Sequence, residues 1–133
     1  MGQQKICLIV VVDDEKQVEE YIQAVLGRLG YDQVSFYDPE KAIEYLSQNA
    51  GRVDLIVSDI LMPGIDGLEL ARKAAEIKPD VPVILLSGYS EKLPDAIALS
   101  NVKSVLHKPV LKTDLVQTVE NAVKGCGRRD KGI

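Results

Sequence analysis

The sequence predicts an α/β fold in which helices cover both faces of one parallel sheet. Short apolar runs of strand length alternate, along 133 residues, with segments whose apolar side chains recur at helical spacing. The short runs are apolar throughout, as expected of strands that are buried on both faces. Because parallel strands are joined by right-handed crossovers, these observations predict a doubly wound, five-stranded α/β sandwich.

Five apolar runs are the strand candidates, at residues 6–12, 34–36, 55–57, 83–86 and 104–106. The longest run has seven residues, far fewer than the roughly 20 that are needed to cross a bilayer. No cationic leader with a cleavage site precedes it. We therefore expect a protein that stays in the cytoplasm and does not contact a membrane.

Two helices are expected in the first half of the chain, one between the first two strands and one after Asp38-Pro39. Gly30 follows the first helical pattern and is a suitable C-terminal cap. Asp38 is a favoured N-cap residue, and Pro39 suits the first helical position. The apolar faces of these two helices would contain Val18, Tyr21, Ile22, Val25, Leu26 and Leu29, and then Ala42, Ile43 and Leu46.

Three further helices are expected in the second half. One follows Asp66-Gly67 and stops before Pro79, a weakly patterned one lies between residues 91 and 99, and the last ends before Gly125. We expect one domain over residues 1–125 and a flexible, solvated tail over residues 126–133. The apolar faces of the third and last helices would contain Leu68, Ala71, Ala74 and Ala75, and then Leu115, Val116, Val119, Ala122 and Val123.

The composition predicts a single domain. Its net negative charge argues against direct binding of nucleic acid. Hydrophobic residues make up 46%, enough for one core, and 20 acidic against 16 basic residues give a net charge of −4. Cys7 and Cys126 belong to no CxxC pattern, so free thiols are expected. The lone histidine, His107, is expected to be an ordinary strand-end residue rather than part of a zinc site or a catalytic triad.

Polar and charged residues directly follow four of the five predicted strands. They are Asp13-Asp14, Asp59, Ser87 and Lys108. Each alone has an ordinary explanation as a helix cap, a turn hydroxyl or a solvated charge. Because the carboxyl ends of parallel strands meet at one edge, where such sheets bind ligands, we expect these side chains to lie together.

Three carboxylates at one edge would repel one another. Two like charges about 4 Å apart cost roughly 4 kcal/mol at an effective dielectric constant near 20. A divalent cation would offset this repulsion. Oxygen ligands of this kind suit Mg²⁺, with Mn²⁺ as an alternative, whereas the EF-hand loop of a common Ca²⁺ site is missing from the sequence.

Asp59 is the expected nucleophile toward a phosphoryl group. It stands alone at its strand end, whereas Asp13 and Asp14 form a pair better suited to binding a metal. Lys108 would neutralise one phosphoryl oxygen, and Ser87 would donate a hydrogen bond to another. The sequence therefore predicts phosphoryl transfer to Asp59 beside a bound cation.

Residues 53–67, which read VDLIVSDILMPGIDG, resemble the phosphoacceptor signature of two-component response-regulator receiver domains of the chemotaxis-regulator-like kind. The resemblance extends over about residues 5–124 and includes the acidic pair, Ser87-Gly88 and Lys108-Pro109 in the family's order. It implies a flavodoxin-like (βα)5 fold with strand order 2-1-3-4-5. It also implies a signalling domain that catalyses only its own phosphorylation and dephosphorylation.

The resemblance also implies a donor and a set of metal ligands. Asp59 would accept the phosphoryl group from a phosphohistidine of a sensor histidine kinase or a phosphotransfer protein. Asp14, Asp59 and the backbone carbonyl of Leu61 would bind Mg²⁺, and Asp13 would contact the ion through water.

Phosphorylation in this family is sensed by a hydroxyl residue and a lysine, here Ser87 and Lys108. The surface of the fourth helix, fifth strand and fifth helix then changes its preference for a downstream protein or an attached output domain. Many members carry an aromatic residue three positions before the lysine, where this chain has Val105, so Tyr89 is the candidate substitute. Leu61 and Tyr89 flank the family's route for hydrolytic water, and their bulk predicts slow dephosphorylation.

Three other functions are alternatives. A non-phosphorylated interaction module of the same fold would not need the acidic pocket. A phosphohydrolase with an aspartyl-phosphate intermediate would need a second acid at Leu61. A nucleotide-binding protein would need a Gly-rich or Ser/Thr-rich loop where Asp13-Asp14-Glu15 would repel phosphate. The sequence leaves open whether a receiver would stand alone or belong to a hybrid kinase or a larger regulator.

Overall fold

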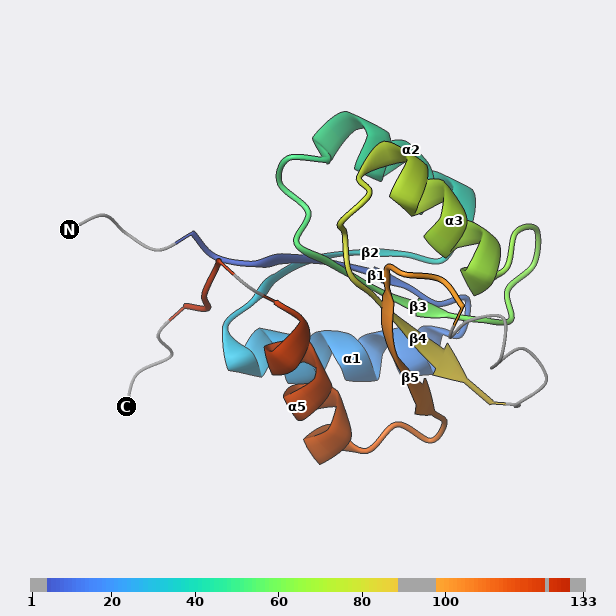
Figure 1. Ribbon diagram of the computed structural model, residues 1–133. Coiled ribbons are helices and arrows are strands. Elements are labelled where there is room, and N and C mark those ends of the chain that lie inside the picture. The colour runs from blue at the N-terminus through green and yellow to red at the C-terminus, as the bar shows by residue number, and fades with distance from the viewer. Residues whose placement is uncertain (1–4, 89–97, 124, 130–133) are drawn as a thin grey trace.

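The computed structural model describes residues 5–88, 98–123 and 125–129, and within them it has the predicted α/β architecture (Figure 1). Five parallel strands form one sheet in the order β2-β1-β3-β4-β5. The predicted strand order and the doubly wound arrangement are therefore confirmed. The strands are β1 (Leu8–Val12), β2 (Asp32–Phe36), β3 (Leu55–Asp59), β4 (Val83–Ser87) and β5 (Val102–His107).

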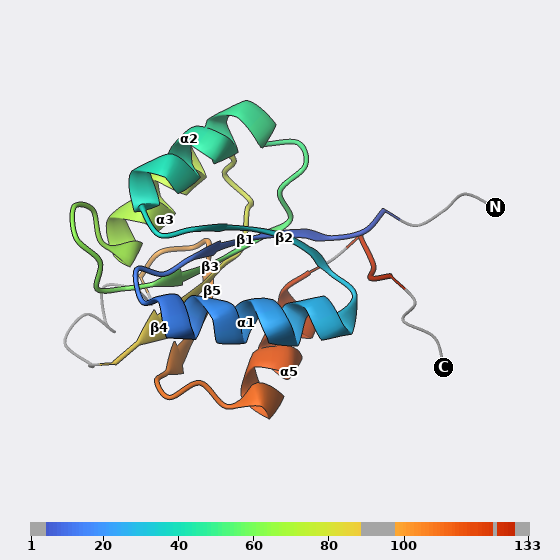
Figure 2. The same cartoon turned by 180° about the vertical axis from the view of Figure 1, so that it is seen from behind.

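Helices cover both faces of the sheet, as the two opposite views show (Figures 1 and 2). Helices α1 (Lys16–Leu29) and α5 (Lys112–Ala122) lie on one face, and α2 (Pro39–Asn49) and α3 (Gly67–Ile77) lie on the other. The helix predicted between residues 91 and 99 falls almost entirely outside the described residues. Among the helices that are described, none is long and apolar enough to cross a membrane.

Burial on both faces explains why the strands are apolar throughout. Every residue of β1, β3 and β4 is buried, whereas the edge strands β2 and β5 are partly exposed. The pleat sends successive side chains to opposite faces, so Val10 packs in the cluster beneath α2 and α3, and Val11 packs in the cluster beneath α1 and α5. The core thus fixes the central strands whose ends form the functional edge.

Local signals in the sequence set the helix ends as predicted. The side chains of Asp38 and Asp66 each accept a hydrogen bond of 2.9 Å, from the backbone N–H of Glu40 and Glu69 respectively, as N-cap residues do. Helix α1 is followed by Gly30, whose φ of 93° lies in the left-handed region that glycine adopts without strain.

The C-terminal segment differs from the predicted solvated tail. Gly127 forms a parallel bridge with Ile6. Its carbonyl accepts a hydrogen bond from the N–H of Cys7 at 2.8 Å, and its N–H donates to the carbonyl of Lys5 at 2.7 Å. Residues 125–129 are therefore docked on the domain, while residues 130–133 lie outside the described part of the chain.

The prediction of two free thiols is wrong, because Cys7 and Cys126 form a disulfide. The two cysteines are 119 residues apart in sequence, and their Cα atoms are 5.1 Å apart. The end of α5 lies near the beginning of β1, on the side of the molecule where both termini emerge (Figure 1). A sequence pattern that considers only neighbouring cysteines does not detect such a pair.

Gly67 is expected to be intolerant of a side chain. A Cβ atom there would lie 2.4 Å from the carbonyl oxygen of Asp59 and 2.9 Å from the Cα of Ile60, and both are backbone atoms of the site loop. Gly67→Ala should therefore lower the free energy of unfolding by about 1–3 kcal/mol, measured by urea denaturation. Gly51→Ala is the control, since no atom lies within 4 Å of the added Cβ. Equal stability of the two variants would contradict the expected clash.

Candidate functional site

Four strand ends bring the predicted site residues to one edge of the sheet. Asp13 directly follows β1, Asp59 ends β3, Ser87 ends β4 and Lys108 follows β5. The backbone N–H of Lys108 donates a 2.8 Å hydrogen bond to the carbonyl of Ser87, which ties the ends of β4 and β5 together. The expectation that these residues share one edge is therefore met.

Three carboxylates converge at this edge. Asp13, Asp14 and Asp59 each contribute an oxygen, and the three oxygens lie within 4.8 Å of one another. Asp13 is 0% exposed and Asp59 is 4% exposed, whereas Asp14 is open to solvent. One oxygen of Asp13, Oδ1, accepts a hydrogen bond from the backbone N–H of Glu15 at 2.8 Å. The other, Oδ2, is buried and has no hydrogen-bond partner among the described residues.

Lys108 supplies the positive charge that the cluster needs. Its Nζ lies 3.0 Å from Oδ2 of Asp59, 2.8 Å from Oε1 of Glu15 and 3.4 Å from Oδ2 of Asp13. The contacts with Asp59 and Glu15 are hydrogen bonds, and the one with Asp13 is an ion pair without a hydrogen bond. One ammonium group therefore partly neutralises several carboxylates.

Burial disfavours the ionised form of both enclosed carboxyl groups. It raises the pKa of Asp13 from 3.8 to about 6, an effect that the charge of Asp59 reinforces and that the N–H of Glu15 and the Lys108 ammonium only partly oppose. Burial also raises the pKa of Asp59 above its ordinary value, against the hydrogen bond and charge of Lys108. Negative charge at this edge is thus costly in the metal-free protein.

The environment favours the charged form of Lys108, in contrast to the two carboxyl groups. Burial by itself lowers the pKa of its ammonium group, but hydrogen bonds to Glu15 and Asp59 and the charges of Asp13 and Asp59 outweigh burial and raise it above 10.5. The side chain is therefore a fixed cation at neutral pH.

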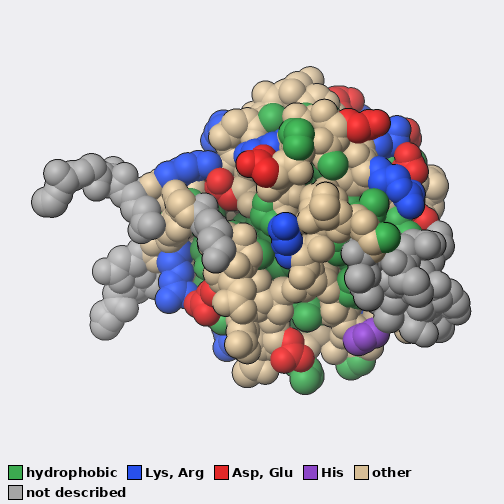
Figure 3. Space-filling model, viewed as in Figure 1, with side chains coloured by type: hydrophobic (Ala, Val, Ile, Leu, Met, Phe, Trp, Pro, Cys, Tyr) green, Lys and Arg blue, Asp and Glu red, His purple; other side chains and the backbone are tan. Residues whose placement is uncertain are grey.

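The other predicted residues surround this centre at different depths. Leu61 lies two residues beyond β3 and is 48% exposed. Val105 lies in β5, is partly buried and packs against the core cluster of α2 and α3. His107 ends β5 and is exposed on the surface (Figure 3). Tyr89 lies outside the described residues, so its predicted role as a switch is untested.

The acidic edge fits a hard divalent cation. Three carboxylates can each direct an oxygen to one point, and the buried Oδ2 of Asp13 needs a partner that no described hydrogen-bond donor supplies. The backbone carbonyl of Leu61 follows on the adjoining loop. Such an all-oxygen set suits Mg²⁺ better than a metal that prefers sulfur or nitrogen ligands.

The family model of the response regulator receiver domain matches residues 9–120, which include all four strand-end positions. The chain belongs to the response regulator receiver family. This receiver is 33% identical over 114 residues to the response regulator receiver protein CpdR of Brucella abortus, and the match covers 84% of this chain and 92% of that protein.

Solved receiver structures have the same fold. A response regulator receiver domain from Clostridium thermocellum is 27% identical, with a TM-score of 0.81 over 88% of this chain and 94% of that one. The receiver domain of the hybrid histidine kinase CckA is 32% identical, with a TM-score of 0.76 over 88% of this chain and 99% of that one. Receivers of this shape therefore occur within different kinds of signalling protein.

Some relatives are much longer than this receiver. It is 32% identical to the transcriptional regulatory protein DctD of Rhizobium meliloti, and the match covers 86% of this chain but 25% of DctD. This chain thus spans about a quarter of the length of DctD, and family membership alone does not assign it an output.

Glu15 is the site residue that sequence reasoning missed. It lies 93 residues before Lys108, yet its carboxylate forms the shortest contact of the lysine side chain, at 2.8 Å. The only signal in the sequence was its position directly after the acidic pair, which also suits an exposed residue at a helix start. The metal-binding and phosphate-binding roles of Asp13, Asp14, Asp59, Leu61, Ser87 and Lys108 stay predictions.

The raised pKa of Asp13 predicts a pH-dependent stability in the absence of metal. The folded value of about 6 exceeds the 3.8 of the ordinary side chain, so the folded state keeps this proton longer and loses stability as pH rises through that window. We expect Asp13 to lower the free energy of unfolding by on the order of 2 kcal/mol between about pH 4 and pH 7. Urea denaturation of wild type and Asp13→Asn at both pH values measures this contribution.

Asp13→Asn should lack this loss of unfolding free energy as the pH rises. It should therefore be more stable than wild type at pH 7. Asp80→Asn is the control, because Asp80 is exposed and precedes β4 at the opposite edge of the sheet. If Asp13→Asn and wild type had parallel pH profiles, burial would not control this carboxyl group.

Proposed function

We propose that this receiver accepts a phosphoryl group on Asp59 from a phosphohistidine of a sensor histidine kinase or a phosphotransfer protein. The observation that carries the proposal is the Lys108 ammonium, 3.0 Å from Oδ2 of Asp59, at an edge where two more carboxylates converge. A domain that only bound partners would gain nothing from burying these charges. Family membership supports the same function.

Transfer would proceed in line at the phosphorus atom. A carboxylate oxygen of Asp59 forms the new P–O bond as the P–N bond to the donor imidazole breaks, and the leaving nitrogen keeps the bonding electrons. Lys108 neutralises charge on the transferred group, and the hydroxyl of Ser87 donates a hydrogen bond to another of its oxygens. The receiver catalyses only its own phosphorylation and dephosphorylation and has no other substrate.

Mg²⁺ is the proposed cofactor, with Mn²⁺ as an alternative. Asp14, Asp59 and the backbone carbonyl of Leu61 would hold the ion, and Asp13 would reach it through water. The bound ion supplies positive charge that offsets carboxylate and phosphoryl charge. Support comes from the Oδ2 of Asp13, which is buried without a hydrogen bond among the described residues.

Switching would begin at the Lys108 contacts. A phosphoryl group on Asp59 offers the ammonium new oxygens and competes with its hydrogen bonds to Glu15 and Asp59. A shift of Lys108 would also displace the end of β4, because the backbone N–H of Lys108 donates a hydrogen bond to the carbonyl of Ser87. The surface of the fourth helix, β5 and α5 would then change its preference for a downstream protein or an attached output domain.

The switch would work without an aromatic residue on β5, because Val105 fills that position and packs on the core. Tyr89 is the proposed substitute. The partner would be a downstream protein or an attached output domain in the cytoplasm, without direct contact of the receiver with nucleic acid or membrane. A non-phosphorylated interaction module is the alternative function.

Intact-mass analysis after incubation with acetyl phosphate and Mg²⁺ tests the phosphoacceptor. We expect one adduct of about 80 Da on wild type, no adduct on Asp59→Asn, and none when the metal is chelated. Asp80→Asn, a carboxyl-to-amide change at the opposite edge of the sheet, should be phosphorylated like wild type. Folded wild-type protein without an adduct would favour the interaction module.

The phosphoryl group on Asp59 should be long-lived. Leu61 is bulky and half exposed beside the site, and Tyr89 is its counterpart after β4, so both would restrict the approach of hydrolytic water. After the phosphodonor is removed in the presence of Mg²⁺, the adduct should decay over minutes or longer, followed by intact mass. A half-life of a few seconds would contradict this hypothesis, and Leu61→Asn should shorten the half-life.

A further inference from the structure

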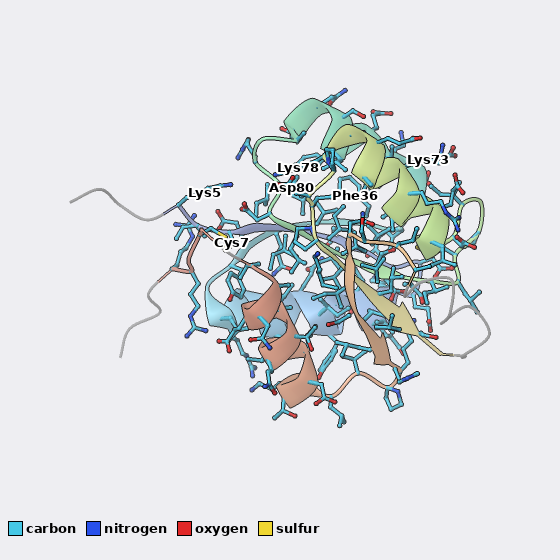
Figure 4. All side chains as sticks on the ribbon, in the orientation of Figure 1. Lys5, Cys7, Phe36, Lys73, Lys78 and Asp80 are labelled. Atoms are coloured by element: carbon cyan, nitrogen blue, oxygen red, sulfur yellow. A yellow bond between two sulfur atoms is a disulfide. The ribbon has the colours of Figure 1, made fainter. Side chains whose placement is uncertain are left out.

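The disulfide between Cys7 and Cys126 lies at the end of the molecule opposite the phosphoacceptor edge. Cys7 directly precedes β1, whose other end carries Asp13. Its side chain is 0% exposed, whereas Cys126 is partly exposed. Figure 4 shows Cys7 near Lys5, where the two termini of the domain emerge. The bond therefore joins the first strand to the segment that follows α5.

Noncovalent contacts hold the same segment weakly. Gly127 makes two backbone hydrogen bonds, of 2.8 and 2.7 Å, with the residues before β1, and the N–H of Arg129 donates to the carbonyl of Gly30 at 2.7 Å. The side chain of Arg129 forms two hydrogen bonds of 3.1 Å with Asp32. Arg128 pairs with Glu120 at 3.0 Å.

Both ion pairs of this segment lie on the surface. The side chains of Arg128 and Arg129 are 48% and 59% exposed, and those of their acidic partners are 43% and 44% exposed. Exposed pairs of this kind contribute little, because water solvates the separated charges almost as well. Chain entropy opposes docking, since the segment has few buried contacts apart from Cys126. The disulfide is therefore the contact that decides whether residues 125–129 stay docked.

A disulfide in this position has an unusual chemical setting. Disulfides are rare in a cytoplasm kept reducing by glutathione and thioredoxin, and those that do form there are usually transient or redox-sensing. Cys126 is the partly exposed residue of the pair and therefore the more accessible one to a thiolate, while the buried Cys7 is shielded. We propose that Cys7 and Cys126 form a redox-controlled clasp, which holds residues 125–129 against β1 when oxidised and releases them when reduced.

Release would occur by thiol–disulfide exchange with a reductant that supplies two thiols, either one dithiol or two molecules of glutathione. A thiolate of the reductant attacks Sγ of Cys126, the bond to Cys7 breaks, and Cys7 leaves as a thiolate that takes up a proton. The second thiol then attacks the reductant's sulfur in the mixed disulfide and frees Cys126, which is protonated in turn. Two electrons and two protons pass to the protein, and the reductant leaves as a disulfide.

Release would expose groups that the docked segment covers. Arg129 lies so close to Gly30 that a Cβ atom on the glycine would be 2.3 Å from the Arg129 carbonyl oxygen. Tyr31 is 7% exposed and packs, like Cys126, in the core cluster of α1 and α5. The clasp thus controls both the direction of the chain beyond α5 and a small surface at the ends of α1 and β1.

The experiment uses the full chain in glutathione buffers that range from an oxidising ratio to the cytosolic one. EDTA is present, because reduced Cys7 and Cys126 with Asp54 could bind a metal ion. Free thiols are alkylated and counted by intact mass, and brief trypsin digestion reports cleavage after Arg128. In oxidising buffer we expect the disulfide to be intact and residues 125–129 to resist trypsin. At the cytosolic ratio we expect two alkylated thiols, cleavage faster by about tenfold or more, and a Tm lower by roughly 10 °C.

Two variants distinguish the clasp from a merely structural bond. Cys126→Ser changes a partly exposed residue and should be cleaved quickly in every buffer. Asp32→Asn removes the ion pair with Arg129 but keeps both trypsin sites, and should stay resistant while oxidised.

Three results would overturn the proposal. They are a disulfide that persists at the cytosolic ratio, reduction that leaves cleavage after Arg128 unchanged, and reduction that exposes the whole chain to trypsin. The test needs no phosphodonor, so its result is independent of phosphoryl transfer to Asp59.

Discussion

The structure depends on holding like charges together at one edge of a sheet. Asp13 and Asp59 are buried beside each other at the ends of adjacent central strands, and Asp14 completes the cluster. One ammonium group, Lys108, partly offsets their repulsion, but burial, reinforced by the charge of Asp59, still raises the pKa of Asp13 to about 6. A cluster of this kind persists only where a rigid core prevents its strands from separating.

The apolar strands provide that rigidity. β1, β3 and β4 are buried along their whole length, with one core cluster under α1 and α5 and another under α2 and α3. The stability of both clusters offsets the cost of the acidic edge, and that cost in turn favours any cation that neutralises it. Structure and proposed chemistry are thus coupled, because the same burial that disfavours free carboxylates strengthens their attraction to a metal cation, which would in turn attract a phosphoryl group.

The first strand connects two chemically different ends of the molecule. One end of β1 leads into the acidic pair, and the other is joined by a disulfide to the segment after α5. Phosphoryl transfer and thiol–disulfide exchange would act on separate groups at opposite edges of the sheet. If both proposals hold, this receiver would respond to a kinase through one edge and to the redox state of its compartment through the other.

The sequence by itself determined the architecture and the main site residues. Apolar runs without alternation could fit only a sheet covered on both faces, and each reactive side chain followed such a run within two residues, so Asp13, Asp59, Ser87 and Lys108 had to share an edge. Tertiary structure alone decided that Glu15 hydrogen-bonds Lys108 and that Cys7 pairs with Cys126, contrary to the expected free thiols. These partners are 93 and 119 residues apart. Periodicity and capping report interactions between chain neighbours, whereas contacts over such separations depend on how the last strand and helix pack on the first.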